Sequence, residues 1–243
     1  MALPTLTELF DSGCHFGHLA QRWNPKMQPY IHSTKSGVHI IDLSQTLAKL
    51  GDACRFVEQV TSGGGQILFV GTKRQARSII RSEAEQSGQP YISERWLGGT
   101  LTNFRTIRER IRHLETLSLG EESGQSEARY TKKELRKLVE ERKKLEQTLS
   151  GISGMAELPA ALLVVDVGRE ELAVREARLL DIPIVAILDT NNNPTGITYP
   201  IPGNDDAIRS LEVLVKSVAD VARRGRESFQ AEQAQQSPVE AAA

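Results

Sequence analysis

The sequence predicts an α/β protein in which a doubly wound, mostly parallel sheet is interrupted by an inserted helical hairpin. Three short apolar runs, 66–70, 161–165 and 184–188, are each followed by a stretch of helical periodicity. Continuous apolar runs of this length are typical of parallel strands covered on both faces, and their alternation with helices indicates βα units. Residues 102–152 instead combine narrow apolar stripes with many charges, which predicts helices that project from the sheet domain.

These patterns divide the chain into four segments. Residues 1–101 form the first part of the α/β domain and include an N-terminal arm. Residues 102–152 form the hairpin, and residues 153–228 complete the domain. The last segment, 229–243, is rich in Gln, Ala and Glu without periodicity, which indicates a disordered tail.

The N-terminal part of the domain begins with a capping-box pattern, Thr5 followed by Glu8, which predicts a short helix. Residues 14–27 mix aromatic, polar and proline residues, and we expect an extended, loop-like arm there. Short strands are predicted at 30–32 and 38–41.

Longer helices are expected where a residue that can cap a helix precedes a periodic stretch. The expected caps are Asp42, Thr72, and Asp205 or Asp206, and the expected helix ends lie near residues 63, 88 and 226. A short strand at 91–92 follows the second of these helices. Residues 191–202 are rich in turn-forming residues and are expected to be a loop.

Two apolar seams define the inserted hairpin. They run along 104–114 and 135–149, with most apolar residues three or four positions apart. A polar turn is predicted at 120–124, and Thr131 begins a second capping box. Half of residues 121–150 are charged, eight basic and seven acidic, so most faces of these helices must lie in solvent. The alternative is a disordered charged insert.

The composition is that of a globular protein, with 39% hydrophobic and 25% charged residues. No apolar run approaches the ~20 residues of a membrane span, and no secretory leader is apparent. The two cysteines, Cys14 and Cys54, are too few for a disulfide framework. We therefore expect the protein to reside in the reducing cytoplasm. Cys14, His15 and His18 have a spacing that could begin a zinc site. No second ligand pair lies nearby in sequence, so neither a metal nor a cofactor is expected.

The net charge of −1 conceals an asymmetry along the chain. Residues 71–112 carry nine Lys and Arg against four Glu, a balance of +5. Residues 151–243 carry eight basic and fourteen acidic residues, a balance of −6. Such a division suits a protein with one face on a polyanion and another toward solvent or protein, although chance clustering on solvated helices is the alternative.

Two cationic turns follow predicted strands. The turn at 71–77 resembles a phosphate-binding turn that opens a helix, but it lacks the glycines of a dinucleotide fingerprint and the Gly-Lys-Ser/Thr of a mononucleotide loop. Phosphate of a polymer therefore fits better than a small nucleotide. The stretch 95–104 places Arg, Trp and two Gly before a basic run at 105–112. The adjacent glycines permit a sharp turn. Trp96 is expected to brace it, and the alternative is that its ring stacks on a base.

Other polar residues have competing interpretations. Asp166 and Asp189 follow strands and could be catalytic or metal carboxylates, but such residues more often cap helices or tie down loops. No matching nucleophile–base pair accompanies them, so no catalytic residue is predicted. The arm at 14–27 interleaves aromatic rings, imidazoles and cations, which suits irregular RNA with unstacked bases. The alternative is an arm that packs on its own domain.

The candidate RNA-binding residues are therefore the cations, imidazoles and amides of the arm and the two turns. They are His15, His18, Arg22, Asn24, Lys26, Lys35, Lys73, Arg74, Arg77, Arg95, Asn103, Arg105 and Arg108.

Several longer motifs carry a resemblance to a known family. They are CHFGH at 14–18, WNPKM at 23–27, LFVGTKR at 68–74, RWLGGTLTN at 95–103, DTN at 189–191 and IPGNDDAIR at 201–209. With these motifs, residues from about 5 to 228 resemble the bacterial-type small-subunit (30S) ribosomal protein two family. The resemblance implies a Rossmann-like domain with a protruding antiparallel coiled-coil hairpin. It also implies binding to 16S rRNA between the head and body of the small subunit, where the family helps dock small-subunit protein one, which captures mRNA.

We therefore expect a structural RNA-binding protein of the ribosome, with 16S rRNA and neighbouring small-subunit proteins including protein one as partners. No membrane and no small-molecule substrate is expected. The location is the cytoplasm, or the plastid stroma if the chain is of plastid origin. The alternatives are a nucleotide or sugar-phosphate binding enzyme of Rossmann-like fold, and a protein–protein adaptor that uses the hairpin.

Overall fold

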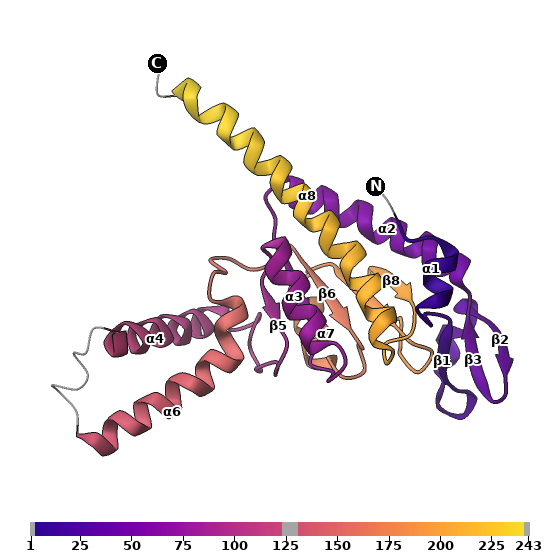
Figure 1. Cartoon of the computed structure of the whole chain (residues 1–243), viewed down its shortest axis with the longest axis horizontal. Coiled ribbons are helices and arrows are strands. Elements are labelled where there is room, and N and C mark those ends of the chain that lie inside the picture. The colour runs from indigo at the N-terminus through magenta and orange to yellow at the C-terminus, as the bar shows by residue number, and fades with distance from the viewer. Residues whose placement is uncertain (1–2, 123–130, 241–243) are drawn as a thin grey trace.

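The computed structural model describes residues 3–122 and 131–240, and its main body is a five-stranded sheet flanked by helices (Figure 1). Neighbouring strands of this sheet are parallel throughout, in the order β5-β4-β6-β7-β8. The strands are β4 (Ile67–Val70), β5 (Tyr91–Ile92), β6 (Ala161–Val165), β7 (Ile184–Leu188) and β8 (Tyr199–Pro202). The predicted α/β class is confirmed, and the fold is Rossmann-like.

Strand β8 is a correction to the sequence-based expectation, which gave residues 191–202 as a loop. Pro200 and Pro202 lack the N–H group that a ladder needs, so the sequence there does not look like a strand. The strand is tolerated because it lies at the sheet edge and pairs with β7 alone.

Helices cover both faces of this sheet. One face carries α2 (Leu43–Ser62), α3 (Arg77–Ser87) and α8 (Ile208–Glu240). The other carries α7 (Glu171–Leu179) and the bases of the two helices that project from the domain. Side chains alternate accordingly along each strand. Phe69 packs in the core beneath α2, α3 and α8, whereas Leu68 packs in the core on the side of α7. Burial on both faces explains why the strands are uniformly apolar.

A second, antiparallel sheet of order β1-β3-β2 forms at the N-terminal end of the chain (Figure 1). Its strands are β1 (Phe16–Leu19), β2 (Ile31–Lys35) and β3 (Val38–Ile41). The helices of this part of the chain are α1 (Leu6–Asp11) and the 3₁₀ helices η1 (Ala20–Arg22) and η2 (Pro25–Tyr30). The capping box at Thr5 and Glu8 is confirmed. The expected loop-like arm at 14–27 is wrong in part, because β1 and two 3₁₀ helices lie there. Met27, on η2, is fully buried and anchors the arm to the domain.

Two helices, α4 (Phe104–Glu122) and α6 (Lys132–Leu149), project from the domain at the end opposite the small sheet (Figure 1). The second is followed by η3 (Ser150–Ile152). Their bases join the core through Ile107, Ile111 and Leu149. The capping box at Thr131 is confirmed. The polar turn predicted at 120–124 is wrong at its start, since α4 continues through Glu122; the rest of that turn lies outside the described residues.

Three expected helix ends differ in the structure. Helix α3 begins at Arg77, not beside Thr72, so Thr72 does not cap it. At the start of α8, the Asn204 side chain accepts from the backbone N–H of Asp206 (2.8 Å) and of Ala207 (2.9 Å), so neither Asp205 nor Asp206 is the cap. Helix α8 extends to Glu240, because Gln, Ala and Glu are good helix formers. The structure thus has helix over most of the segment for which a disordered tail was predicted; residues 241–243 lie outside the description.

Candidate nucleic-acid interface

The loops that follow the five parallel strands meet at one edge of the sheet, as parallel strands require. Both cationic turns belong to this edge, because the turn 71–77 follows β4 and the turn 95–103 follows β5. From β4 the chain turns to β5 on one side, whereas β6 to β8 lie on the other. The strand order therefore reverses at β4, and such a switch point is where loops diverge and sites form in this class of sheet.

Lys73 lies at this switch point in a cluster of carboxylates. Its ammonium Nζ lies 2.6 Å from Asp205 Oδ1, 2.6 Å from Asp206 Oδ1 and 3.4 Å from Asp166 Oδ2. Burial would lower the pKa of Lys73, but the neighbouring charge of Asp205 and its hydrogen bonds raise it above the usual value. The side chain is only 13% exposed. Its charge is therefore matched within the protein.

Asp205 is the buried centre of that cluster. Its carboxylate is fully buried, and burial together with the charges of Asp189 and Asp166 raises its pKa to about 7 despite the attraction of Lys73. Asn192 Nδ2 donates to its second oxygen at 3.1 Å, and Gly168 N–H donates to Asn192 Oδ1 at 3.0 Å. These contacts tie together the loops after β4, β6, β7 and β8.

His18 connects the N-terminal arm to the same cluster. Its Nδ1 lies 3.0 Å from Asp189 Oδ1 and its Nε2 lies 3.3 Å from Asp206 Oδ2. The hydrogen bond to Asp189 raises the pKa of His18, against the lowering effect of burial. The backbone N–H of His18 also donates to Thr190 Oγ1 at 2.9 Å. The arm is thus fixed in place by the loop after β7.

One group in the described part of the chain offers metal-type ligands: His18, Asp189 and Asp205 place ligand atoms within 4.8 Å of one another. The Lys73 ammonium already provides a cation to Asp205. The sequence motif that could begin a zinc site does not assemble, because Cys14 Sγ lies 2.9 Å from Ser210 Oγ and the ring of His15 stacks on Phe10 at 4.4 Å.

The turn 71–77 is held by a buried carboxylate that sequence patterns did not single out. Glu170 Oε1 accepts from Thr72 N–H (2.7 Å) and from Thr72 Oγ1 (2.6 Å). Burial raises the pKa of Glu170, and the hydrogen bonds from Thr72 oppose that rise. Thr72 therefore serves as an anchor of the turn instead of a helix cap.

The turn 95–103 is held by a second buried carboxylate, Glu176. One oxygen accepts from Trp96 Nε1 (3.0 Å) and Gly99 N–H (2.9 Å). The other accepts from Leu101 N–H (3.0 Å), Thr102 N–H (3.1 Å) and Thr102 Oγ1 (3.1 Å). Burial raises the pKa of Glu176, but these donors outweigh it and lower the value below its usual range. Trp96 is 7% exposed, which confirms its bracing role.

The thirteen candidate residues fall into two groups by environment. Five are fixed by contacts within the protein: His15 against Phe10, His18 and Lys73 in the carboxylate cluster, Asn24 capping η2, and Arg77 bound to Glu94 and to the Thr72 carbonyl. The others are largely at the surface: Arg22, Lys26, Lys35, Arg74, Arg95, Asn103, Arg105 and the half-buried Arg108. Within the described ranges, the side chains of Arg74, Arg95 and Arg108 form no hydrogen bond or ion pair.

The sequence offered one signal for the missed carboxylates. Glu176 lies beside Ala173 and Ala177, three before and one after it, on the apolar face of its helix. A charged residue there must find partners, since a buried charge is costly without them. Its partners, however, lie 74 to 80 residues away in sequence, and no local pattern predicts such a distance.

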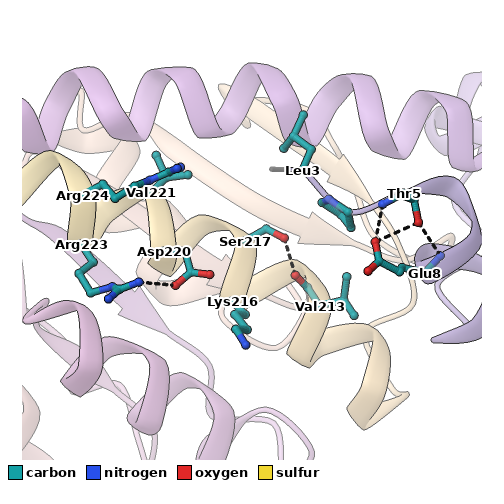
Figure 2. A pocket seen from close by; sticks show the side chains of 11 residues that line it. Leu3, Thr5, Glu8, Val213, Lys216, Ser217, Asp220, Val221, Arg223 and Arg224 are labelled. Carbon is teal, nitrogen blue, oxygen red and sulfur yellow. Dashed lines mark hydrogen bonds and ion pairs between the residues drawn. The ribbon is translucent and has the colours of Figure 1, made fainter. Parts of the chain in front are cut away.

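A pocket lies away from this edge, between the N-terminal segment and α8 (Figure 2). Its lining mixes apolar and charged side chains, including Leu3, Val213, Lys216 and an ion pair between Arg223 and Asp220 at 3.2 Å. Across the residues that the structure describes, no helix combines the length and the apolar character that a membrane crossing requires.

The fold and the polar edge define a class: a Rossmann-like α/β protein whose switch-point loops are tied together by internal ion pairs, with exposed arginines at their rim that have no ion-pair partner among the described residues. The family model described as "Ribosomal protein S2" matches residues 9–225. The small ribosomal subunit protein uS2 of Mycolicibacterium gilvum is 51% identical over 225 residues, which cover 93% of this chain and 80% of that protein. The proteins of the same name from Mycolicibacterium vanbaalenii and Nocardia farcinica are 49% identical (100% of this chain, 88% of theirs) and 51% identical (93% and 79%).

The chain therefore belongs to the ribosomal protein S2 family. It is a structural protein of the small ribosomal subunit that serves translation, and it is not an enzyme. The alternative of a nucleotide or sugar-phosphate binding enzyme is set aside on that ground.

Proposed function

We propose that this protein binds 16S rRNA through the two cationic turns and the base of α4. The observation that carries the proposal is a set of exposed arginines at one edge of the sheet, two of which have no ion-pair partner among the described residues. Arg74 and Arg95 are exposed and form no ion pair within the described residues, and the side chain of Arg105, at 93% exposure, makes one long contact of 3.5 Å to Glu109. Guanidinium groups in this state are available to phosphates.

The fixed residues have a different role in this proposal. Lys73 and His18 are engaged by internal carboxylates, so they contribute by holding the loops and the arm in place. Lys26 donates to Thr195 Oγ1 at 2.8 Å but is exposed, and with Arg22 and Lys35 it extends the RNA-binding surface along the arm. Asn24 caps η2 and so holds the arm in its conformation. His15 is 9% exposed, so any RNA contact there is made through its neighbours.

The finer assignments follow the family resemblance. The site on the subunit is between head and body, and the more acidic second half of the chain, with the pocket beside α8, faces neighbouring proteins including small-subunit protein one. The projecting helices α4 and α6 pair as a coiled-coil hairpin that spans RNA or a protein neighbour. The location is the cytoplasmic ribosome, since the relatives compared are bacterial; a plastid location remains a prediction.

Co-sedimentation with small subunits that lack this protein tests the proposal. Arg74, Arg95 and Arg105 changed together to Ala should reduce the bound fraction at least about tenfold near 0.15 M salt, because three phosphate contacts are lost. The matched control changes three exposed arginines of α2 and α7, Arg55, Arg175 and Arg178, to Ala, because they lie outside both turns and outside the pocket beside α8. Equal binding of both variants and the wild type would remove this edge from the RNA interface.

A further inference from the structure

The two cationic turns are separate in sequence, yet one helix holds both. We propose that Glu170 and Glu176, at the start and in the body of α7, are positioning residues that set the cations of both turns in one fixed frame for RNA. The inference rests on the proposed function, since it concerns how that RNA surface is formed.

Glu176 holds the second turn along most of its length. Five donors of residues 96–102 converge on its two oxygens, three of them backbone N–H groups. The carboxylate is 4% exposed, so water cannot replace it readily. The turn ends where α4 begins, at Phe104. The direction in which α4 leaves the domain, and with it the position of Arg105, therefore depends on this carboxylate.

Glu170 has the same role at the first turn. It holds both the N–H and the hydroxyl of Thr72, and the Thr72 carbonyl accepts from Arg77 Nε at 3.0 Å. Arg77 Nη1 in turn donates to Glu94 at 2.9 Å, in the loop that leads into the second turn. The two turns are thus connected directly and, through α7, by a rigid element.

The negative charge of these residues makes the inference testable. If Glu176 acted on RNA only through its charge, its removal would strengthen binding, since a carboxylate repels phosphate. If it acts by position, its removal weakens binding. Gln has nearly the same shape, but its amide nitrogen cannot accept a hydrogen bond, so donors of the turn lose partners.

The experiment measures binding of the full chain to 16S rRNA at several salt concentrations, for wild type, Glu176→Gln, Glu170→Gln and Glu171→Gln. Glu171 is the matched control, because it lies on the same helix and its side chain is 73% exposed. Glu171→Gln removes the same charge but breaks only a surface ion pair with Arg175. We expect Glu176→Gln to bind about tenfold more weakly with a shallower salt slope, because fewer phosphates are engaged at once. Glu170→Gln should follow in the same direction, and Glu171→Gln should bind as tightly as wild type or more tightly.

Folding is checked by circular dichroism and thermal unfolding. If Glu176→Gln does not fold, Thr102→Val and Trp96→Phe replace it. Thr102→Val removes one hydroxyl donor to Glu176 at nearly the same shape, and Trp96→Phe removes the indole N–H donor together with one ring; each should weaken RNA binding about two- to fivefold. Folded variants that bind as wild type, or more tightly, overturn the inference and leave the proposed function intact. Failure of the wild type to bind 16S rRNA overturns both.

Discussion

The turns 71–77 and 95–103 look alike in sequence, but they present their charge differently. Each follows a parallel strand, carries basic residues and is anchored by a buried glutamate of the α7 segment. In the first, Lys73 lies within 3.4 Å of three carboxylates, so its charge is neutralised inside the protein. In the second, Arg95 has no ion-pair partner among the described residues. The number of cations in a motif is therefore a poor measure of the charge available to RNA.

Replacement of Lys73 should have the largest effect on this comparison. Lys73→Ala leaves the buried Asp205 beside Asp189 and Asp166 without its counter-ion, and breaking a buried pair costs about 3–5 kcal/mol. At pH 8, where Asp205 is ionised, we expect the free energy of unfolding in urea to fall by about 3 kcal/mol. Arg95→Ala, the matched change in the other turn, should leave it within about 0.5 kcal/mol of wild type. Equal stability of the two variants would show that the turns do not differ in this way.

The pH dependence of stability should come from the first turn. The pKa of Asp205 is raised to about 7 in the folded protein, so the native state binds a proton that the unfolded chain releases near pH 4. The stability of the fold should therefore decrease as pH rises from about 4 to 7, by no more than about 1.4 kcal/mol per unit. His18, whose pKa is also raised, stabilises the fold below about 6.5 and loses this contribution as pH rises through its folded value.

Urea unfolding of wild type and Asp205→Asn at pH 5, 6, 7 and 8 checks this pH dependence. The variant should show a flatter profile between pH 5 and 7, because Asp205 no longer contributes to the titration there and the contribution of His18 remains. A wild-type stability that rises over the same interval would contradict the assignment.

The smallest expected effect is at the link between the turns. Glu94→Gln breaks the ion pair with Arg77, whose side chains are 46% and 39% exposed, and exposed pairs contribute about 0.2–1 kcal/mol. Stability should fall within that range. RNA affinity should fall slightly, since the direct link between the two turns is lost while Arg77 stays bound to the Thr72 carbonyl. A rise in affinity would mean that the charge removed at Glu94 matters more to RNA than the link between the turns.

The fold was largely predictable from the sequence, because most of its strands and helix starts are marked by patterns of neighbouring residues. The uniform apolar runs at β4, β6 and β7 identify buried parallel strands, and Thr5 and Thr131 identify helix starts by their capping boxes. The predictions that were wrong concern features that depend on residues distant in the sequence. The prolines of β8 hide a strand that only an edge position permits. Thr72 looks like a helix cap until Glu170, 98 residues away, is seen to bind it.

The candidate site was predictable in its location but not in its internal organisation. The motifs correctly directed attention to the loops after β4 and β5, since both lie at the carboxyl edge. They gave no means of separating Lys73, which is held by carboxylates, from Arg74, which is free within the described residues, although the two are adjacent. That distinction arises from Asp166, Asp205 and Asp206, which the fold brings to Lys73 from other loops.

The most direct test of the central claim is the salt dependence of 16S rRNA binding by the folded wild-type protein, beside the Arg74, Arg95 and Arg105 triple alanine variant. Each phosphate contact contributes about 0.7–0.9 to the slope of log K against log salt concentration. The wild-type slope should exceed the variant's by about 2 to 3, at unchanged thermal stability. Equal slopes for two folded proteins would contradict the claim that these turns bind RNA.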